Sequence, residues 1–332
     1  MATTPTGSWR WGDDVANWTA KFLAAFHRVA GGLRRPKKVK SRSFDERNGK
    51  APFNASGVAQ VGPRRFVFID NHDPSALFEL ALDADGGEIE RISRRPMAGV
   101  TNAQLRDPEG LTRVDHDGQI FLIVTSSLCV VDGKKSDGLV RVRYRPHGDL
   151  QTEAMPGFRD WLLRHVPPLA AVGQRDPDAG GLNIEGLAWD PHTGTLVFGQ
   201  RGPAESARAT VIRIPVDAGA ARWNTGSLGA PSIVHARIPG TTALQGIRDI
   251  AYDEQAGNFL ILLGRSTSSG DEPFQLGTWK GGDDEIALLD VTFQRSMKPE
   301  GIVAFSSGDE RKLLIVDDRG GYAVLEYPTR HQ

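Results

Sequence analysis

The chain has 332 residues, of which 39% are hydrophobic and 24% are charged, a balance typical of a globular protein that can bury a core. The formal net charge of -1 excludes a strongly basic protein whose overall field would attract nucleic acid or anionic lipid. The single cysteine, Cys129, excludes an intramolecular disulfide, and the 38 Gly and 20 Pro suit a chain with many tight turns.

The location of the protein is expected from features that the sequence lacks. No apolar run approaches the roughly 20 residues that a membrane helix needs. Lys21 and Arg28 interrupt the apolar stretch after the polar start, which disfavours a secretory signal. Cys129 lies in an apolar run, which favours a small buried hydrophobe in a reducing compartment over a nucleophile. We therefore expect a cytoplasmic protein with no transmembrane segment.

An amphipathic helix is predicted near the N-terminus. Apolar residues recur every three or four positions between residues 15 and 33, and a basic run follows at residues 34–40. Such a helix can bind a membrane surface or a partner. Packing across the rest of the protein is favoured, because basic runs near termini are often only solvated. We predict residues 1–48 as this helix and its basic linker, and residues 49–332 as a separate domain.

One strand-rich unit recurs five times along the chain. Each copy has a short motif of small or acidic residues, an apolar strand, a turn, a second apolar strand, a polar break and a further strand. The residues that follow the motif are spaced by 53, 76, 63 and 52 positions: Val58, Leu111, Leu187, Ile250 and Ile302. This spacing suits a four-stranded blade with its loops. The repeat predicts an all-β protein, a β-propeller of five or six four-stranded blades, rather than a β-sandwich with a second domain.

Two segments outside the repeat affect the number of blades. The longest step contains residues 158–165, whose pattern predicts a short helical insertion. A sixth blade would have to lie in this insertion or in residues 36–56. Residues 39–44 can instead supply the last strand of the fifth blade, which would close the ring and hide its edge.

A ring of polar residues is predicted at one end of the propeller channel. The first strand of each blade runs along the central channel, so the start of each unit should point towards one end of it. Aligning the units places the following residues in one ring: Ser56, Glu109, Glu185, Arg248 and Glu300. Converging carboxylates raise one another's pKa unless something compensates their charge. Either a metal ion, or Arg248 with hydrogen bonds between blades, can supply that compensation.

Calcium is the cation that these residue types favour. It takes about six to eight oxygen ligands from carboxylates, amide carbonyls and water. Zinc is disfavoured, because no cluster of His or Cys accompanies the acids. We predict Ca²⁺ and no organic cofactor, with these metal ligands: Glu109, Glu185, Glu300, Asn183 and Asp107.

A second polar layer follows the second strands of the units. His72 beside Asp70 can act as a general base, and Arg201 can bind a phosphate or carboxylate. We predict these three residues as catalytic: His72, Asp70 and Arg201. Further ligand-binding residues are predicted at Arg248, Asp249, Arg265, Asn71 and Asp317. The alternatives are a surface histidine, and arginines that only balance neighbouring acids.

Three Glu-Gly pairs and two longer motifs carry a resemblance to a known family. The stretch Asn183-Ile-Glu-Gly-Leu-Ala and residues 199–203, Gly-Gln-Arg-Gly-Pro, resemble the bacterial propeller family catalogued as domain of unknown function thirty-six sixteen. More distantly, roughly residues 50–328 are similar to the esterase-like phytase propellers. The closer family implies the fold but no particular activity. The phytase-like relatives imply phosphoester hydrolysis with calcium, and no catalytic residue is carried over from them.

Two functions remain open. The sequence contains no nucleophile elbow, phosphate-binding loop or dinucleotide fingerprint, and no interleaved basic and aromatic residues of the kind that bind nucleic acid. The first hypothesis is a metal-assisted hydrolase of a phosphoester or ester with its site at the central channel. The second is a non-catalytic scaffold or sensor that binds a protein or small ligand at the propeller face. We expect no nucleic-acid partner and no membrane-surface contact by the N-terminal helix.

Overall fold

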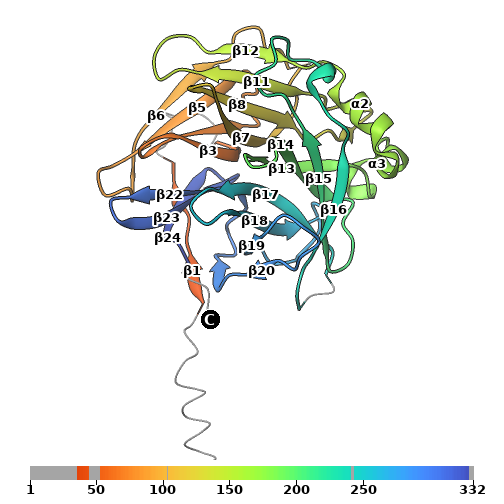
Figure 1. Ribbon diagram of the computed structural model, residues 1–332. Helices are drawn as coiled ribbons and strands as arrows, with labels where there is room; N and C mark the ends of the chain where they lie inside the picture. Colours follow the sequence, from red (N-terminus) through yellow and green to blue (C-terminus); the bar gives the residue numbers. More distant parts are fainter. Residues whose placement is uncertain (1–35, 45–52, 103, 241–242, 329–332) are drawn as a thin grey trace, which may run out of the picture. The chain divides into compact units, whose positions relative to one another are not determined.

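The computed structural model describes residues 36–44, 53–102, 104–240 and 243–328. Contacts within the chain group residues 38–332 as one unit, in which five sheets of four antiparallel strands are arranged radially (Figure 1). The prediction of a five-bladed β-propeller is therefore confirmed. The predicted N-terminal helix and the predicted boundary after residue 48 lie outside the described residues.

Each blade begins with its innermost strand, and the other three strands follow outward. In chain order the blades are β3 (Ala55–Gly62), β4 (Arg65–Asp70), β5 (Ala76–Leu82) and β6 (Ile89–Pro96); β7 (Pro108–His116), β8 (Gln119–Ser126), β11 (Leu139–Tyr144) and β12 (Gln151–Ala154); β13 (Asn183–Asp190), β14 (Thr195–Gly202), β15 (Arg208–Pro215) and β16 (Ser232–Arg237); β17 (Gln245–Asp253), β18 (Asn258–Arg265), β19 (Gln275–Trp279) and β20 (Ala287–Leu288); and β22 (Pro299–Ser307), β23 (Glu310–Asp317), β24 (Gly321–Glu326) and β2 (Arg42–Ser43). Two small ribbons pair β1 (Lys37–Val39) with β21 (Val291–Phe293) and β9 (Val130–Val131) with β10 (Lys134–Lys135).

The ring is closed by the segment that precedes blade 1. Strand β2 pairs antiparallel with β24, with Arg42 opposite Tyr322, and so completes blade 5. Phe44, just after β2, stacks on Phe68 of blade 1 and on Tyr322 of blade 5, at centroid distances of 5.2 and 5.7 Å. This pairing hides the free edge of β24, as the sequence predicted.

The hydrophobic core lies between the blades. Five clusters of buried apolar side chains occur, each shared mainly by two neighbouring blades. Leu122 and Ile123 are consecutive in β8, and they enter different clusters because successive side chains of a strand point to opposite faces. Strands such as β8 are therefore apolar on both faces, since a neighbouring blade covers each side.

The predicted helical insertion is confirmed. It consists of α2 (Phe158–His165) and α3 (Pro167–Val172), with a 3₁₀ turn at Pro177–Ala179. Phe158 stacks on Phe198 of β14 at 5.5 Å between ring centroids, which ties α2 to the core between blades 2 and 3. None of the helices in the described residues has the length and apolar character that crossing a membrane requires.

The glycine of the Glu-Gly pairs lies where innermost strands approach one another. A Cβ atom on Gly110 would lie 2.6 Å from Cβ of Leu187, and one on Gly186 would lie 2.9 Å from Cγ2 of Ile250. Glycine is required here because any larger residue would push the blades apart. Blade 4 has Asp249 at this position, and its carboxylate accepts the backbone N–H of Ile302 at 2.7 Å. The predicted ligand-binding residue Asp249 thus joins blades 4 and 5.

Candidate functional site

A β-bulge interrupts the start of every innermost strand. In blades 2 to 5 the pairing register skips one polar residue, and these residues are Glu109, Glu185, Arg248 and Glu300. In blade 1 it skips Gly57, next to Ser56. A bulged residue has no direct partner across the ladder, and the bulge re-aims its side chain. The bulge lets a long polar side chain depart from the strand's alternation between its two faces, while the next residue keeps its side chain in the core.

The three glutamates of the ring lie together. One carboxylate oxygen from each of Glu109, Glu185 and Glu300 lies within 4.8 Å of the other two. Their exposed fractions are 9%, 1% and 3%. The predicted convergence of side chains from blades 2, 3 and 5 is confirmed, and we call these three residues the glutamate cluster.

Arg248 of blade 4 is buried beside two members of the cluster. Its Nη1 lies 2.9 Å from Oε2 of Glu185, and its Nη2 donates a hydrogen bond to Oε1 of Glu300. Arg248 was predicted to bind a ligand. The structure uses its guanidinium to bridge two carboxylates, as the alternative of a structural network expected.

Two further cations border the cluster. Arg201 Nη1 donates to Glu185 Oε1 at 2.6 Å, and its Nε donates to the backbone carbonyl of Arg265 at 3.2 Å. Lys298 Nζ lies 3.3 Å from Glu300 Oε1 and also pairs with Asp318. Burial alone would lower the pKa of both cations, but the nearby carboxylates outweigh it and raise both pKa values.

The donors to Glu109 are neutral. Ser56 Oγ donates to its Oε2 at 2.9 Å, and Asn71 Nδ2 donates to its Oε1 at 2.9 Å. Burial raises the pKa of Glu109 well above its ordinary value, and Asp107 and the other two glutamates raise it further. For Glu300, burial outweighs the opposing effect of Arg248 and raises the pKa to about 7. In both residues burial is the largest cause of the raised pKa, and the neighbouring glutamates add to it.

Among the buried atoms of the cluster without a hydrogen-bond partner, acceptors outnumber donors, although Nε of Arg248 is such a donor. Oε2 of Glu300, Oδ1 of Asn183 and Oδ1 of Asn71 are buried without a hydrogen-bond partner, and Oε2 of Glu185 has only its ion contact with Arg248. Asn183 is 6% exposed, and its Nδ2 donates to Glu185 Oε1 at 3.3 Å, so the amide belongs to the cluster. An unpartnered buried acceptor is costly, and a cation or a donor from a ligand would satisfy these oxygens.

Asp70 and Asp317 occupy equivalent positions at the ends of β4 and β23. Each carboxylate accepts two backbone N–H groups, at 3.1 and 3.0 Å for Asp70 and at 2.9 and 3.1 Å for Asp317. In blades 1 and 5 these bonds fix the turn after the second strand, beside the start of the innermost strand. The predicted catalytic role of Asp70 and ligand-binding role of Asp317 stay predictions.

The remaining predicted residues lie around the same end of the channel. His72 has a side chain that is 57% exposed, with Nδ1 3.8 Å from Asp70 Oδ1. Arg265 Nη1 donates to the carbonyl of Gly270 at 3.1 Å. Asp107, with φ of 55°, faces the Sγ of Cys129 at 3.7 Å. Burial raises the pKa of Cys129, which keeps it a thiol, in agreement with the expected buried hydrophobe.

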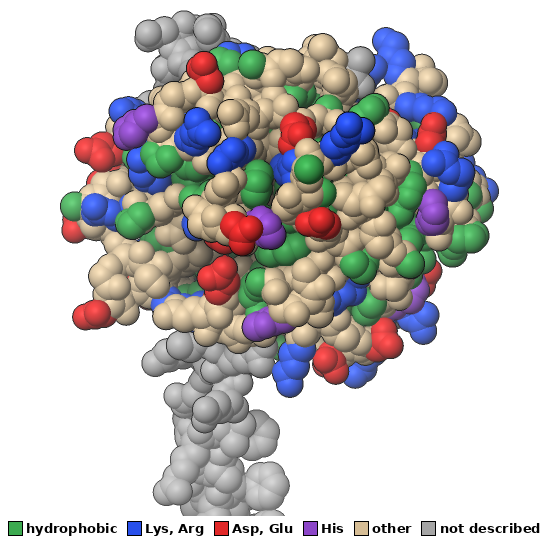
Figure 2. All heavy atoms as spheres, turned by 45° about the horizontal axis from the view of Figure 1, so that its top comes forward, with side chains coloured by type: hydrophobic (Ala, Val, Ile, Leu, Met, Phe, Trp, Pro, Cys, Tyr) green, Lys and Arg blue, Asp and Glu red, His purple; other side chains and the backbone are tan. Residues whose placement is uncertain are grey.

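Sequence reasoning missed Lys298. It lies two residues before Glu300 in the sequence, and this nearness to a ring glutamate was the signal available. On the face shown in Figure 2, acidic and basic side chains are interspersed, and neither sign forms a continuous patch.

Comparisons with known proteins add nothing on activity. No protein-family model and no curated sequence matches the chain, so the resemblance to the propeller family and to the phytase propellers stays a prediction. Solved structures with a similar fold include the Malassezia sympodialis allergen Mala s 1, with 10% identity, 83% of this chain and 92% of that chain covered, and a TM-score of 0.49. Myxococcus xanthus glutaminyl cyclase is 11% identical, with 89% of this chain and 100% of that chain covered and a TM-score of 0.42. An endo-arabinase from Bacteroides thetaiotaomicron is 9% identical, with 86% of this chain and 96% of that chain covered and a TM-score of 0.46.

Proposed function

We propose that the glutamate cluster binds a divalent cation of the calcium type, and that the protein is a metal-assisted hydrolase of a phosphoester or ester. The observation that carries this proposal is the surplus of buried acceptor oxygens contributed by Glu185, Glu300 and Asn183. Carboxylate oxygens that repel one another and lack donors are what a hard cation relieves.

The spacing of the carboxylates supports a cation of this size. Calcium binds oxygens at about 2.3–2.6 Å, so two ligands on opposite sides of the ion are about 4.6–5.2 Å apart. The oxygens of Glu109, Glu185 and Glu300 lie within 4.8 Å of one another, which matches this span. Asn183 offers an amide oxygen, and Asp107 is a further carboxylate whose charge raises the pKa of Glu109. Asn71 would keep Glu109 oriented by its hydrogen bond.

The neighbouring cations suit an anionic or polarised substrate. A bound cation supplies a water of lowered pKa as nucleophile. Arg201 and Lys298 lie beside the cluster, and their charges can stabilise negative charge that develops on a phosphoryl or carbonyl oxygen. Arg248 is fully buried and would hold Glu185 and Glu300 in place rather than touch the substrate.

Thermal melting with and without metal tests the cation site. After treatment with a chelator, CaCl₂ or MnCl₂ should raise the melting temperature of the wild type, since a ligand at 100 times its Kd stabilises by about 2.7 kcal/mol. Glu185→Gln should lose this response. Glu79→Gln, the same change in a buried carboxylate elsewhere, should keep it. An equal response in Glu185→Gln would overturn the site.

Activity is tested on the same three proteins. Hydrolysis of p-nitrophenyl phosphate or p-nitrophenyl acetate should require the metal, and it should be lost in Glu185→Gln and kept in Glu79→Gln. If the metal binds but no ester is hydrolysed, the hydrolase part of the proposal is wrong and the cation site remains.

A non-catalytic scaffold or sensor is the second candidate function. The observation that favours it is the set of ion pairs in the cluster, in which Arg248, Arg201 and Lys298 pair with Glu185 and Glu300. Such a network can simply lock blades 3, 4 and 5 together. The scaffold would be favoured if no divalent ion changed the melting temperature of the wild type.

A further inference from the structure

A second cavity lies in the channel, away from the glutamate cluster. It has a volume of about 610 Å³, within the range of small-molecule sites. It is lined by the later halves of the innermost strands, whereas the glutamates lie at the strand starts. At about 3.3 Å per residue, Arg113 in the cavity lies about 13 Å along β7 from Glu109.

An apolar layer separates the two sites. Val58, Leu111 and Leu187 line the cavity, are almost fully buried, and follow the bulges of their strands. A ligand in the cavity would therefore meet these side chains before it reached the cluster. The two sites can be altered independently.

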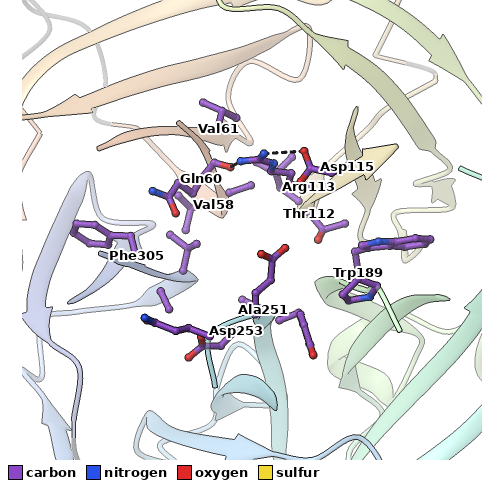
Figure 3. Close-up of a pocket in the computed structure, with 18 of the residues that line it drawn as sticks. Val58, Gln60, Val61, Thr112, Arg113, Asp115, Trp189, Ala251, Asp253 and Phe305 are labelled. Carbon is purple, nitrogen blue, oxygen red and sulfur yellow. Dashed lines mark hydrogen bonds and ion pairs between the residues drawn. The ribbon is translucent and has the colours of Figure 1, made fainter. Parts of the chain in front are cut away.

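Both aromatic and hydrogen-bonding side chains face the cavity. Figure 3 shows Trp189 and Phe305 on opposite sides of the opening, with Gln60, Thr112 and Asp115 around the rim between them. Trp189 is half-buried, so part of its ring is accessible. Flat apolar surfaces and polar groups thus alternate around one opening, which suits a ligand with both kinds of surface.

Both cations that line the cavity are paired with acids, and Glu254 is a third lining acid. Arg113 Nη2 donates to Asp115 Oδ1 at 2.7 Å, and its Nη1 donates to the carbonyl of Gln60 at 3.1 Å. Arg311 donates to both oxygens of Asp253, at 2.7 and 2.5 Å. Asp115 and Asp253 thus compete with a phosphate or carboxylate for these two cations, and Nε of Arg113 is a further buried donor without a hydrogen-bond partner. Glu254 is exposed, so water screens its charge.

We infer that this cavity binds a neutral polyhydroxylated ligand, a sugar of one or two rings. The C–H face of a sugar ring can pack against Trp189, while Thr112, Gln60 and Asp115 can bond its hydroxyls. A purely apolar ligand would cover the buried Thr112 hydroxyl without offering it a hydrogen-bond partner, which is costly. An anion would have to compete with the acid that each cation already binds. This inference does not depend on the proposed metal site.

Calorimetry and saturation-transfer NMR on the full chain test the inference. The probes are glucose, galactose, xylose, arabinose, maltose and cellobiose, with inorganic phosphate and choline as charged controls. At least one sugar should bind saturably with a Kd of about 0.1–10 mM, and neither charged control should compete with it. The overturning results are no saturable sugar binding, or displacement of the sugar by phosphate or choline.

Three variants locate the binding. Thr112→Val, which removes a hydroxyl at nearly constant volume, should weaken the sugar about tenfold. Trp189→Ala should abolish binding, with its melting temperature recorded to show that it is folded. Glu185→Gln should bind the sugar like the wild type. Unchanged affinity in Thr112→Val and Trp189→Ala, or loss of affinity in Glu185→Gln, would place the sugar elsewhere and overturn the inference.

Discussion

Two buried carboxylate networks of this propeller have opposite electrostatics. Between blades 1 and 2, Glu79 accepts hydrogen bonds from Arg65, from Arg95 at 2.7 Å and from the hydroxyl of Tyr144 at 3.0 Å. Burial would raise the pKa of Glu79, but these donors outweigh it and lower the pKa. In the glutamate cluster the pKa values of Glu109 and Glu300 are raised.

The difference lies in the balance of donors and acceptors. Glu79 has donors on both oxygens, so its network is complete within the protein. The glutamate cluster keeps unpartnered oxygens on Glu300 and Asn183. Burial of an acid is therefore no sign of a site by itself, whereas buried acceptors without protein donors are free to bind a cation or water.

Removing the Arg248 guanidinium should lower the free energy of unfolding the most. Arg248→Met breaks two buried ion pairs at once and leaves Glu185 only Arg201 and Glu300 only Lys298, and breaking a buried ion pair costs about 3–5 kcal/mol. Arg95→Met is the matched control in the other network, and it should cost about 1–2 kcal/mol, because Glu79 keeps Arg65 and Tyr144. Urea unfolding measures both free energies. Equal losses would contradict the distinction between the two networks.

A methyl group placed between two innermost strands should have the second-largest effect on the free energy of unfolding. Gly186→Ala places a methyl group 3.0 Å from the backbone nitrogen of Ile250 and should cost about 1–3 kcal/mol. Gly87→Ala is the control, because a Cβ there meets nothing within 4 Å. Its free energy of unfolding should match that of the wild type. A harmless Gly186→Ala would show that packing at the channel does not hold the cluster together.

The change in stability at low pH on replacing Glu79 should be the smallest of the three effects. The lowered pKa of Glu79 contributes stability that is present above its ordinary pKa of about 4.5 and is lost as the pH falls through the lowered value. Glu79→Gln removes this contribution, because the amide does not titrate. Melting between pH 7 and pH 3 should thus show a smaller acid loss in Glu79→Gln. Parallel curves for wild type and variant would contradict the completeness of the Glu79 network.

The fold could be predicted because each blade corresponds to one copy of the sequence repeat. Apolar runs in β8 or β18 recur at blade spacing, and the short strand at Arg42–Ser43 had an evident place as the closing strand. The convergence of Glu109, Glu185 and Glu300 followed from aligning the repeats, since equivalent positions of a radial array must meet at its axis.

The partners within the site were less predictable. A bulge shifts one residue against its partner strand, and nothing in the Glu-Gly pairs alone specifies it. The turn role of Asp70 depends on backbone N–H directions, which a residue pattern does not contain. The far cavity depends on the sizes of side chains from all five innermost strands, such as Trp189 and Thr112.

Anomalous diffraction from crystals of the full chain soaked in MnCl₂ tests the cation site most directly. We expect one strong manganese peak between the carboxylates of Glu109, Glu185 and Glu300, present in Glu79→Gln crystals and absent from Glu185→Gln crystals. A map with no peak among these three side chains, or with manganese only on the outer surface, would contradict the account.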